Sequence, residues 1–168
     1  SASEARELLS SYIQTAEAGT AEGIDGTLPN IIVIMNEAFS DLSVLGDFET
    51  NQDYMPFIRS LMESGENTHS GYLNVSVLGG NTANTEFEFL TGNSMAFLPQ
   101  GSIPYQQYIK SEVPSLASYL KEYGYTTIGM HPYNSGGWDR DKVYPLLGLD
   151  TSYFIKDFED PELIRKYV

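Results

Sequence analysis

The stretch Gly79-Gly80-Asn81-Thr82-Ala83-Asn84-Thr85-Glu86-Phe87 decides the fold prediction, because it turns a strand-like run at 72–78 into a helix. The two glycines allow the backbone to approach a ligand closely. The helix that follows would point its unpaired N–H groups and the positive end of its dipole at that ligand, and anions bind readily at such places. A threonine hydroxyl becomes a nucleophile there if a base or a cation takes its proton. The stretch therefore makes Thr82 a candidate catalytic residue.

A structural role explains the same residues equally well. The side chain of Thr82 or Asn81 could act as the N-cap of the helix, which is worth about 1 kcal/mol of stability. The local pattern leaves both interpretations open.

The composition indicates one soluble α/β domain and excludes several partners. The chain has 168 residues, of which 41% are hydrophobic, and a formal net charge of −14. This charge argues against nucleic acid or an anionic membrane surface as a partner, because both require a basic face. The sequence contains no apolar run of about 18 residues, the length that spans a bilayer.

The residues that could bind a metal are mainly oxygen ligands. The chain has no cysteine and two histidines, His69 and His131. Thiolate metal sites, disulfides and a cysteine nucleophile are therefore excluded. Oxygen ligands favour magnesium, manganese or calcium over zinc.

Hydrophobic periodicity predicts a layered α/β fold with a mainly parallel sheet and helices on both faces. Residues 1–28 are expected to form an amphipathic helix and a linker, and residues 29–168 the α/β domain. The stretch after residue 160 does not resemble the end of a finished domain, so we expect the chain to be a fragment. Strands are expected at 31–35, 71–78, 125–130 and 153–158, helices at 4–18, 54–63, 113–124 and 139–147, a short helix after the glycine turn, and a loop at 92–104.

Three polar residues are expected at one edge of the sheet. Glu37 follows the strand at 31–35, Thr82 follows the strand at 71–78, and His131 follows the strand at 125–130. Ligands of open α/β sheets bind at the carboxyl ends of the strands. Glu37 could equally be a solvated carboxylate that caps a turn.

Four separated motifs resemble the lipoteichoic acid synthase family. They are Pro-Asn-Ile-Ile-Val-Ile-Met-Asn-Glu at 29–37, Asn-Thr-Ala-Asn-Thr-Glu-Phe at 81–87, Leu-Pro-Gln-Gly at 98–101 and His-Pro-Tyr-Asn-Ser-Gly-Gly-Trp-Asp-Arg-Asp at 131–141. That family consists of extracellular phosphoglycerol transferases in the alkaline phosphatase and sulfatase superfamily. The resemblance implies that residues 29–168 are the N-terminal part of such a catalytic domain.

The resemblance also implies roles for individual residues. Glu37 and Thr82 would be ligands of one divalent cation, manganese first and magnesium as the alternative, and Thr82 would attack a phosphodiester to form a phosphoglycerol-threonine intermediate. Trp138 and Arg140 would hold the glycerophosphate, and His131 would lie at the entry to that loop. By pattern alone, Trp138 and Arg140 could instead be a buried aromatic residue and a surface ion pair.

The resemblance further implies a phosphatidylglycerol-like lipid donor, a glycolipid or polymer acceptor, and a membrane-anchored parent protein whose catalytic domain faces outward. The family completes its metal site in the second half of the catalytic domain, which this chain does not include. We therefore expect the 168 residues alone to bind metal weakly and to lack turnover.

Three alternative functions are considered. Phosphoethanolamine transferases also use a threonine nucleophile, but they usually carry disulfides. A sulfatase needs cysteine or serine in a Cys/Ser-x-Pro-x-Arg pattern, which residues 80–86 lack. The third alternative is a non-catalytic α/β binding module in which Thr82 only caps a helix.

Overall fold

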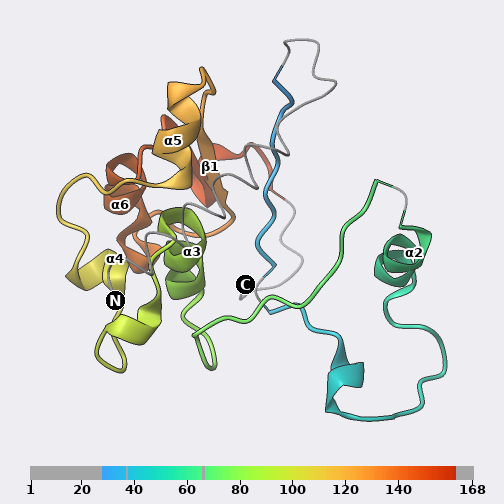
Figure 1. The fold of residues 1–168 in the computed structure, drawn as a ribbon. Helices are drawn as coiled ribbons and strands as arrows, with labels where there is room; N and C mark the ends of the chain where they lie inside the picture. The colour runs from blue at the N-terminus through green and yellow to red at the C-terminus, as the bar shows by residue number, and fades with distance from the viewer. Residues whose placement is uncertain (1–27, 37, 66, 162–168) are drawn as a thin grey trace, which may run out of the picture. The chain divides into compact units, whose positions relative to one another are not determined.

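The computed structural model describes residues 28–36, 38–65 and 67–161, and it divides the chain into two units, Ser1–Ile34 and Met35–Val168. In the first unit, the described residues 28–34 contain neither helix nor strand. The elements described below belong to the second unit and are coloured along the chain in Figure 1. The helix expected at 4–18 lies outside the described residues.

The described residues of the second unit form short helices and, toward the end of the chain, two strands. Within the described ranges no helix has the length and apolar character needed to cross a membrane. In chain order the elements are η1 (Leu42–Leu45), α2 (Pro56–Ser64), α3 (Thr82–Thr91), η2 (Met95–Phe97), α4 (Pro104–Gln107), α5 (Leu116–Glu122), β1 (Ile128–His131), η3 (Gly137–Asp139), α6 (Arg140–Leu146), β2 (Thr151–Phe154) and η4 (Ile155–Asp157), where η denotes a 3-10 helix.

The two strands are parallel, and α6 connects them. Ile128 lies opposite Thr151, and His131 lies opposite Phe154. Parallel strands need such a crossover because the end of one strand and the start of the next lie at opposite edges of the sheet. The prediction of an α/β fold with a parallel sheet is therefore confirmed.

Two predicted strands are wrong for the described residues. The runs at 31–35 and 71–78 are irregular, and the ladder of the described part joins β1 to β2 without them. Ile32 and Ile34 are each 83% exposed, and Leu78 is 96% exposed. An apolar run forms a strand only when a neighbouring strand accepts its hydrogen bonds and another layer covers it. Within the described residues, the run at 71–78 meets neither condition.

Other predicted boundaries shift by a few residues. The strand expected at 153–158 is β2 at 151–154, because Asp157 accepts a hydrogen bond from the N–H of Phe154 at 2.7 Å and closes η4. The strand expected at 125–130 is β1 at 128–131. The loop expected at 92–104 contains η2 and leads into α4.

Hydrogen bonds between the residues that precede the strands hold their register. Thr127 precedes β1, and Asp150 precedes β2. The Asp150 carboxylate accepts hydrogen bonds from the N–H of Thr127 at 2.8 Å and from Lys121 at 2.6 Å. The Lys121 contact, followed by the bonds from Thr127, lowers the pKa of Asp150 to about 2. Asp150 is therefore ionised at neutral pH, as its contacts with Thr127 and Lys121 require.

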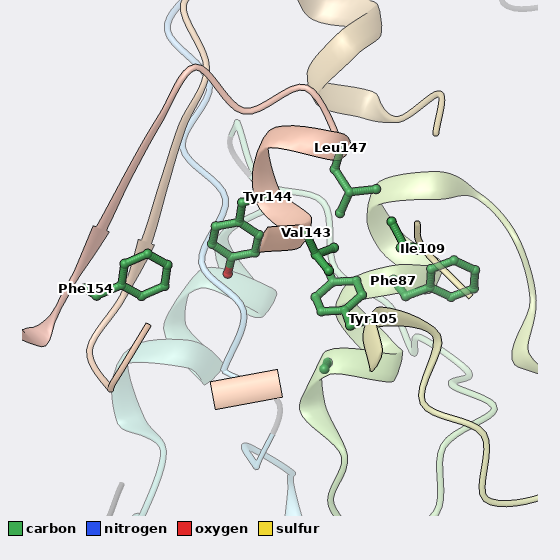
Figure 2. Close-up of a cluster of buried hydrophobic side chains, with 8 residues drawn as sticks. Phe87, Tyr105, Ile109, Val143, Tyr144, Leu147 and Phe154 are labelled. Carbon is green, nitrogen blue, oxygen red and sulfur yellow. The ribbon is translucent and has the colours of Figure 1, made fainter. Parts of the chain in front are cut away.

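The core brings α3, α4, α6 and β2 together (Figure 2). Tyr144 of α6 stacks on Phe154 of β2, with ring centroids 6.0 Å apart. In α3, Ala83 and Phe87 are four residues apart, so both face the core. The buried members are Ala83, Phe87, Tyr105, Ile109, Val143, Tyr144, Leu147 and Phe154.

The loop after α6 packs closely on the start of α5. Ser115 caps α5, and its hydroxyl also donates a hydrogen bond to the carbonyl oxygen of Leu147. Gly148 has φ +85°, and a Cβ atom there would lie 2.9 Å from the Cβ of Ser118. Both the backbone conformation and the space at this position therefore require glycine.

We expect Gly148→Ala to lower the free energy of unfolding by at least about 1–2 kcal/mol, the usual cost of a left-handed conformation for a residue with a side chain. Urea unfolding of the protein measures this loss. Gly136→Ala is the matched control, because Gly136 has φ −72° and its added Cβ would meet nothing within 4 Å. A similar loss in both variants would contradict the prediction.

Candidate functional site

A left-handed turn places Thr82 at the first residue of α3. Gly79, Gly80 and Asn81 have φ values of +66°, +83° and +59°. A Cβ built on either glycine would meet nothing within 4 Å, so the backbone conformation, not crowding, requires glycine there. The tight turn predicted between residue 78 and the helix is confirmed, although the segment before it is not a strand.

Asn81 occupies the N-cap position, but its side chain makes no capping hydrogen bond. Thr82 lies one residue inside the helix and is half-buried. Side-chain capping, the structural alternative for this turn, is therefore excluded for Asn81. The first N–H groups of a helix have no partner within the helix and can donate hydrogen bonds to an anion.

Glu86 lies one turn further along α3, on the same face as Thr82. Its carboxylate binds Arg140, the first residue of α6. Glu86 Oε2 accepts hydrogen bonds from Arg140 Nε at 3.0 Å and from Arg140 Nη2 at 2.8 Å. The side chains of Arg140 and Glu86 are 2% and 15% exposed. The predicted phosphate ligand Arg140 is thus part of a buried ion pair, not of a surface one.

Two tyrosines surround the Glu86 carboxylate. Tyr144 donates a hydrogen bond from its hydroxyl to Glu86 Oε1 at 2.5 Å. Burial, and then the negative charge of Glu86, raise the pKa values of Tyr105 and Tyr144 well above the ordinary value of 10.0. Both hydroxyls therefore stay protonated at neutral pH. The Tyr144 hydroxyl and the Arg140 guanidinium therefore compensate the Glu86 carboxylate, whereas the Tyr105 hydroxyl makes no hydrogen bond within the described residues.

His131, the last residue of β1, joins this cluster through Arg140. Its Nε2 lies 3.3 Å from Arg140 Nη1. Burial, followed by the positive charge of Arg140, lowers the pKa of His131 below 6.5, and Glu86 opposes this shift. The expectation that His131 lies at the carboxyl end of a strand is confirmed.

Trp138 and Asp139 precede Arg140 with φ values of +59° and +56°. Two successive non-glycine residues in this region cost roughly 1–2 kcal/mol each. Trp138 is half-buried and packs against the core cluster. Strained backbone of this kind is common at functional sites. The structure thus assigns Trp138 a packing contact, and its role in holding a substrate stays a prediction.

The described residues do not complete a metal site. Glu37 lies outside them, and in the described ranges no group of three histidine or acidic residues could hold a metal ion. Three buried oxygens in the same part of the chain make no hydrogen bond: Asn84 Oδ1, Thr85 Oγ1 and Tyr105 Oη. None of these atoms is a carboxylate, so a fit to a divalent cation is not shown by this structure.

The predicted residues thus fall into four groups. The structure brings His131 and Arg140 into contact, places Thr82 on the helix face that carries Glu86, the partner of Arg140, packs Trp138 against the core, and leaves Glu37 undescribed. Glu86 and Tyr144 were not predicted as members of the site. The spacing of four residues between Thr82 and Glu86 was the available signal.

The chain belongs to the sulfatase family, whose sequence profile matches residues 29–167. It is 46% identical over 122 residues to a putative cyclic beta-1,2-glucan modification protein of Rhizobium meliloti, covering 73% of this chain and 18% of that protein. It is 31% identical over 125 residues to the lipoteichoic acid synthase of Staphylococcus saprophyticus, covering 74% and 19%.

A solved structure of the lipoteichoic acid synthase LtaP from Listeria monocytogenes is also similar, with 28% identity and a TM-score of 0.48. The match covers 54% of this chain and 22% of that one. The chain therefore spans about a fifth of the length of the relatives named here.

We expect Glu86→Gln to lower the free energy of unfolding by about 3 kcal/mol, because it leaves the Arg140 charge buried without its counter-ion. Chemical denaturation measures the change. Lys142→Met is the control, because it removes an exposed ion pair in which Lys142 is 73% exposed. Exposed pairs are worth about 0–1 kcal/mol. Equal losses in the two variants would show that the Glu86 pair behaves as a surface pair.

Proposed function

We propose that this chain is part of a phosphoglycerol transferase that uses Thr82 as its nucleophile. The observation that carries the proposal is the turn of three left-handed residues that puts Thr82 at the start of α3. Membership of the sulfatase family supports it, as does similarity to lipoteichoic acid synthases. The donor would be a phosphatidylglycerol-like lipid.

The proposed reaction has two displacement steps. The Thr82 hydroxyl oxygen attacks the phosphorus of the donor, the bond from phosphorus to the lipid oxygen breaks, and the leaving diacylglycerol takes up the hydroxyl proton. An acceptor alcohol then attacks the phosphorus, the bond from phosphorus to the Thr82 oxygen breaks, and that oxygen takes up the alcohol's proton to restore the Thr82 hydroxyl. The N–H groups at the start of α3 favour the negative charge that develops on the phosphate oxygens. Trp138, Arg140 and His131 would line the glycerophosphate site.

We also propose a divalent cation for the intact protein, manganese first and magnesium as the alternative, with Glu37 and Thr82 among its ligands. A cation at that place would lower the pKa of the threonine hydroxyl. The parent protein would be membrane-anchored, with its catalytic domain on the extracellular face. Sulfate ester hydrolysis and phosphoethanolamine transfer are the competing activities within the superfamily.

Thr82→Ala in the intact protein is expected to abolish transfer, lowering kcat at least 1,000-fold while leaving the unfolding midpoint nearly unchanged. Mass spectrometry after incubation with phosphatidylglycerol should find one phosphoglycerol group on the peptide that contains Thr82. Thr91→Ala, at the other end of α3, is the control and should keep the adduct. Full activity of Thr82→Ala would refute the nucleophile assignment and leave a binding module as the better account.

We propose a glucan as the acceptor, in preference to the glycolipid or polymer that the family resemblance implies. The 46% identity to a protein named for cyclic beta-1,2-glucan modification exceeds the 31% identity to a lipoteichoic acid synthase. A sugar hydroxyl can replace the glycerol hydroxyl as the attacking alcohol without any other change in the chemistry proposed above.

We expect the intact protein to transfer phosphoglycerol to a cyclic β-1,2-glucan at least tenfold faster than to a glycolipid that starts a glycerophosphate polymer. Radiolabelled phosphatidylglycerol with each acceptor in turn measures the two rates. Thr82→Ala with the glucan gives the background. A faster reaction with the glycolipid would contradict the glucan as acceptor and indicate that the protein synthesises a glycerophosphate polymer.

A further inference from the structure

The contact between Arg140 and His131 determines which nitrogen of His131 can carry a proton. Arg140 Nη1 and His131 Nε2 are 3.3 Å apart. A guanidinium is always charged and only donates hydrogen bonds, so Nε2 must accept in this contact. A neutral imidazole that accepts at Nε2 has its proton on Nδ1.

The guanidinium itself is held firmly in place. Glu86 Oε2 accepts from Arg140 Nε at 3.0 Å and from Nη2 at 2.8 Å, and the carbonyl oxygen of Gly137 accepts from Nη1 at 3.2 Å. The side chain of Arg140 is 2% exposed. Its charge therefore stays beside the His131 ring.

The charged neighbours of His131 shift the pKa of its ring in opposite directions. Arg140 disfavours a second proton on the ring, and burial does the same, while Glu86 favours it. Tyr133 contacts the ring edge to face, with centroids 6.4 Å apart. The larger effects keep His131 neutral at neutral pH.

We propose that Glu86 and Arg140 are positioning residues that hold His131 as a neutral ring protonated at Nδ1, so that His131 offers a hydrogen-bond donor, not a base, to a phosphate diester. The binding of a substrate by this donor rests on the proposed function, whereas the protonation state of the His131 ring does not. One consequence is that His131 cannot take the proton of Thr82, because Nε2 is engaged by Arg140 and Nδ1 already carries a hydrogen.

The ring state is measured directly by long-range proton–nitrogen NMR on the intact protein labelled with ¹⁵N-histidine, with the His131 signals assigned by their loss in His131→Gln. The expected spectrum at pH 7 has a protonated Nδ1 and an unprotonated Nε2, and the ring titrates below pH 6.5. A ring protonated at Nε2, or a charged ring at pH 7, would overturn the proposal.

The double variant Glu86→Gln with Arg140→Met tests whether these two residues set the protonation state of His131. It removes both charges together, so neither is left buried without its partner. The His131 pKa should rise toward 6.5, and both neutral tautomers should be populated. An unchanged spectrum would show that Arg140 does not set the ring state.

Steady-state kinetics with phosphatidylglycerol test the donor role. An asparagine amide can present its N–H near the position of Nδ1, whereas glutamine reaches the position of Nε2. His131→Gln should raise KM about tenfold, the loss of one hydrogen bond to a charged group, and His131→Asn should keep KM within about threefold. Equal losses of kcat in both variants would indicate a base and overturn the donor role, as would no effect in either. Absence of transfer by the unmodified protein would contradict the proposed function, while the NMR result would still decide the protonation state of the His131 ring.

Discussion

The ion pair between Glu86 and Arg140 is the contact on which the rest of this site depends. It joins residues 54 positions apart, one on α3 and one at the start of α6. Removing two charges from water is costly, and only good geometry with further hydrogen bonds offsets that cost. Here Tyr144 and the carbonyl of Gly137 supply those bonds. The pair thereby ties the helix that carries Thr82 to the parallel βαβ unit.

The same pair bears on the proposed binding of a phosphate at this site. An arginine whose charge is free attracts phosphate strongly, but the guanidinium of Arg140 already has a carboxylate partner and almost no exposure. The attraction for a phosphate would then come mainly from the N–H groups at the start of α3 and from neutral donors. Discrimination among phosphate esters in such a site depends on the direction of hydrogen bonds more than on net charge.

Local features of the fold could be predicted from the sequence, and features that need distant partners could not. Gly79, Gly80 and Asn81 adopt positive φ values more readily than other residues do, so the turn before Thr82 was predictable from the local sequence. The runs at 31–35 and 71–78 have strand-like composition, yet strands need neighbours that the local sequence does not specify. The site shows the same division. His131 was placed correctly from strand periodicity, while the partnership of Arg140 with Glu86 depends on how α3 and α6 pack.

The eight described members of the buried cluster lie between Ala83 and Phe154, and Phe154 is the last of them along the chain. A polypeptide leaves the ribosome from its N-terminal end, and its contacts form once both partners have emerged. The helices that Tyr144 and Phe154 pack against are therefore already outside when these two aromatic rings appear. The cluster can therefore form as soon as β2 has left the ribosome, which limits the time that its apolar side chains are available to chaperones or to other nascent chains.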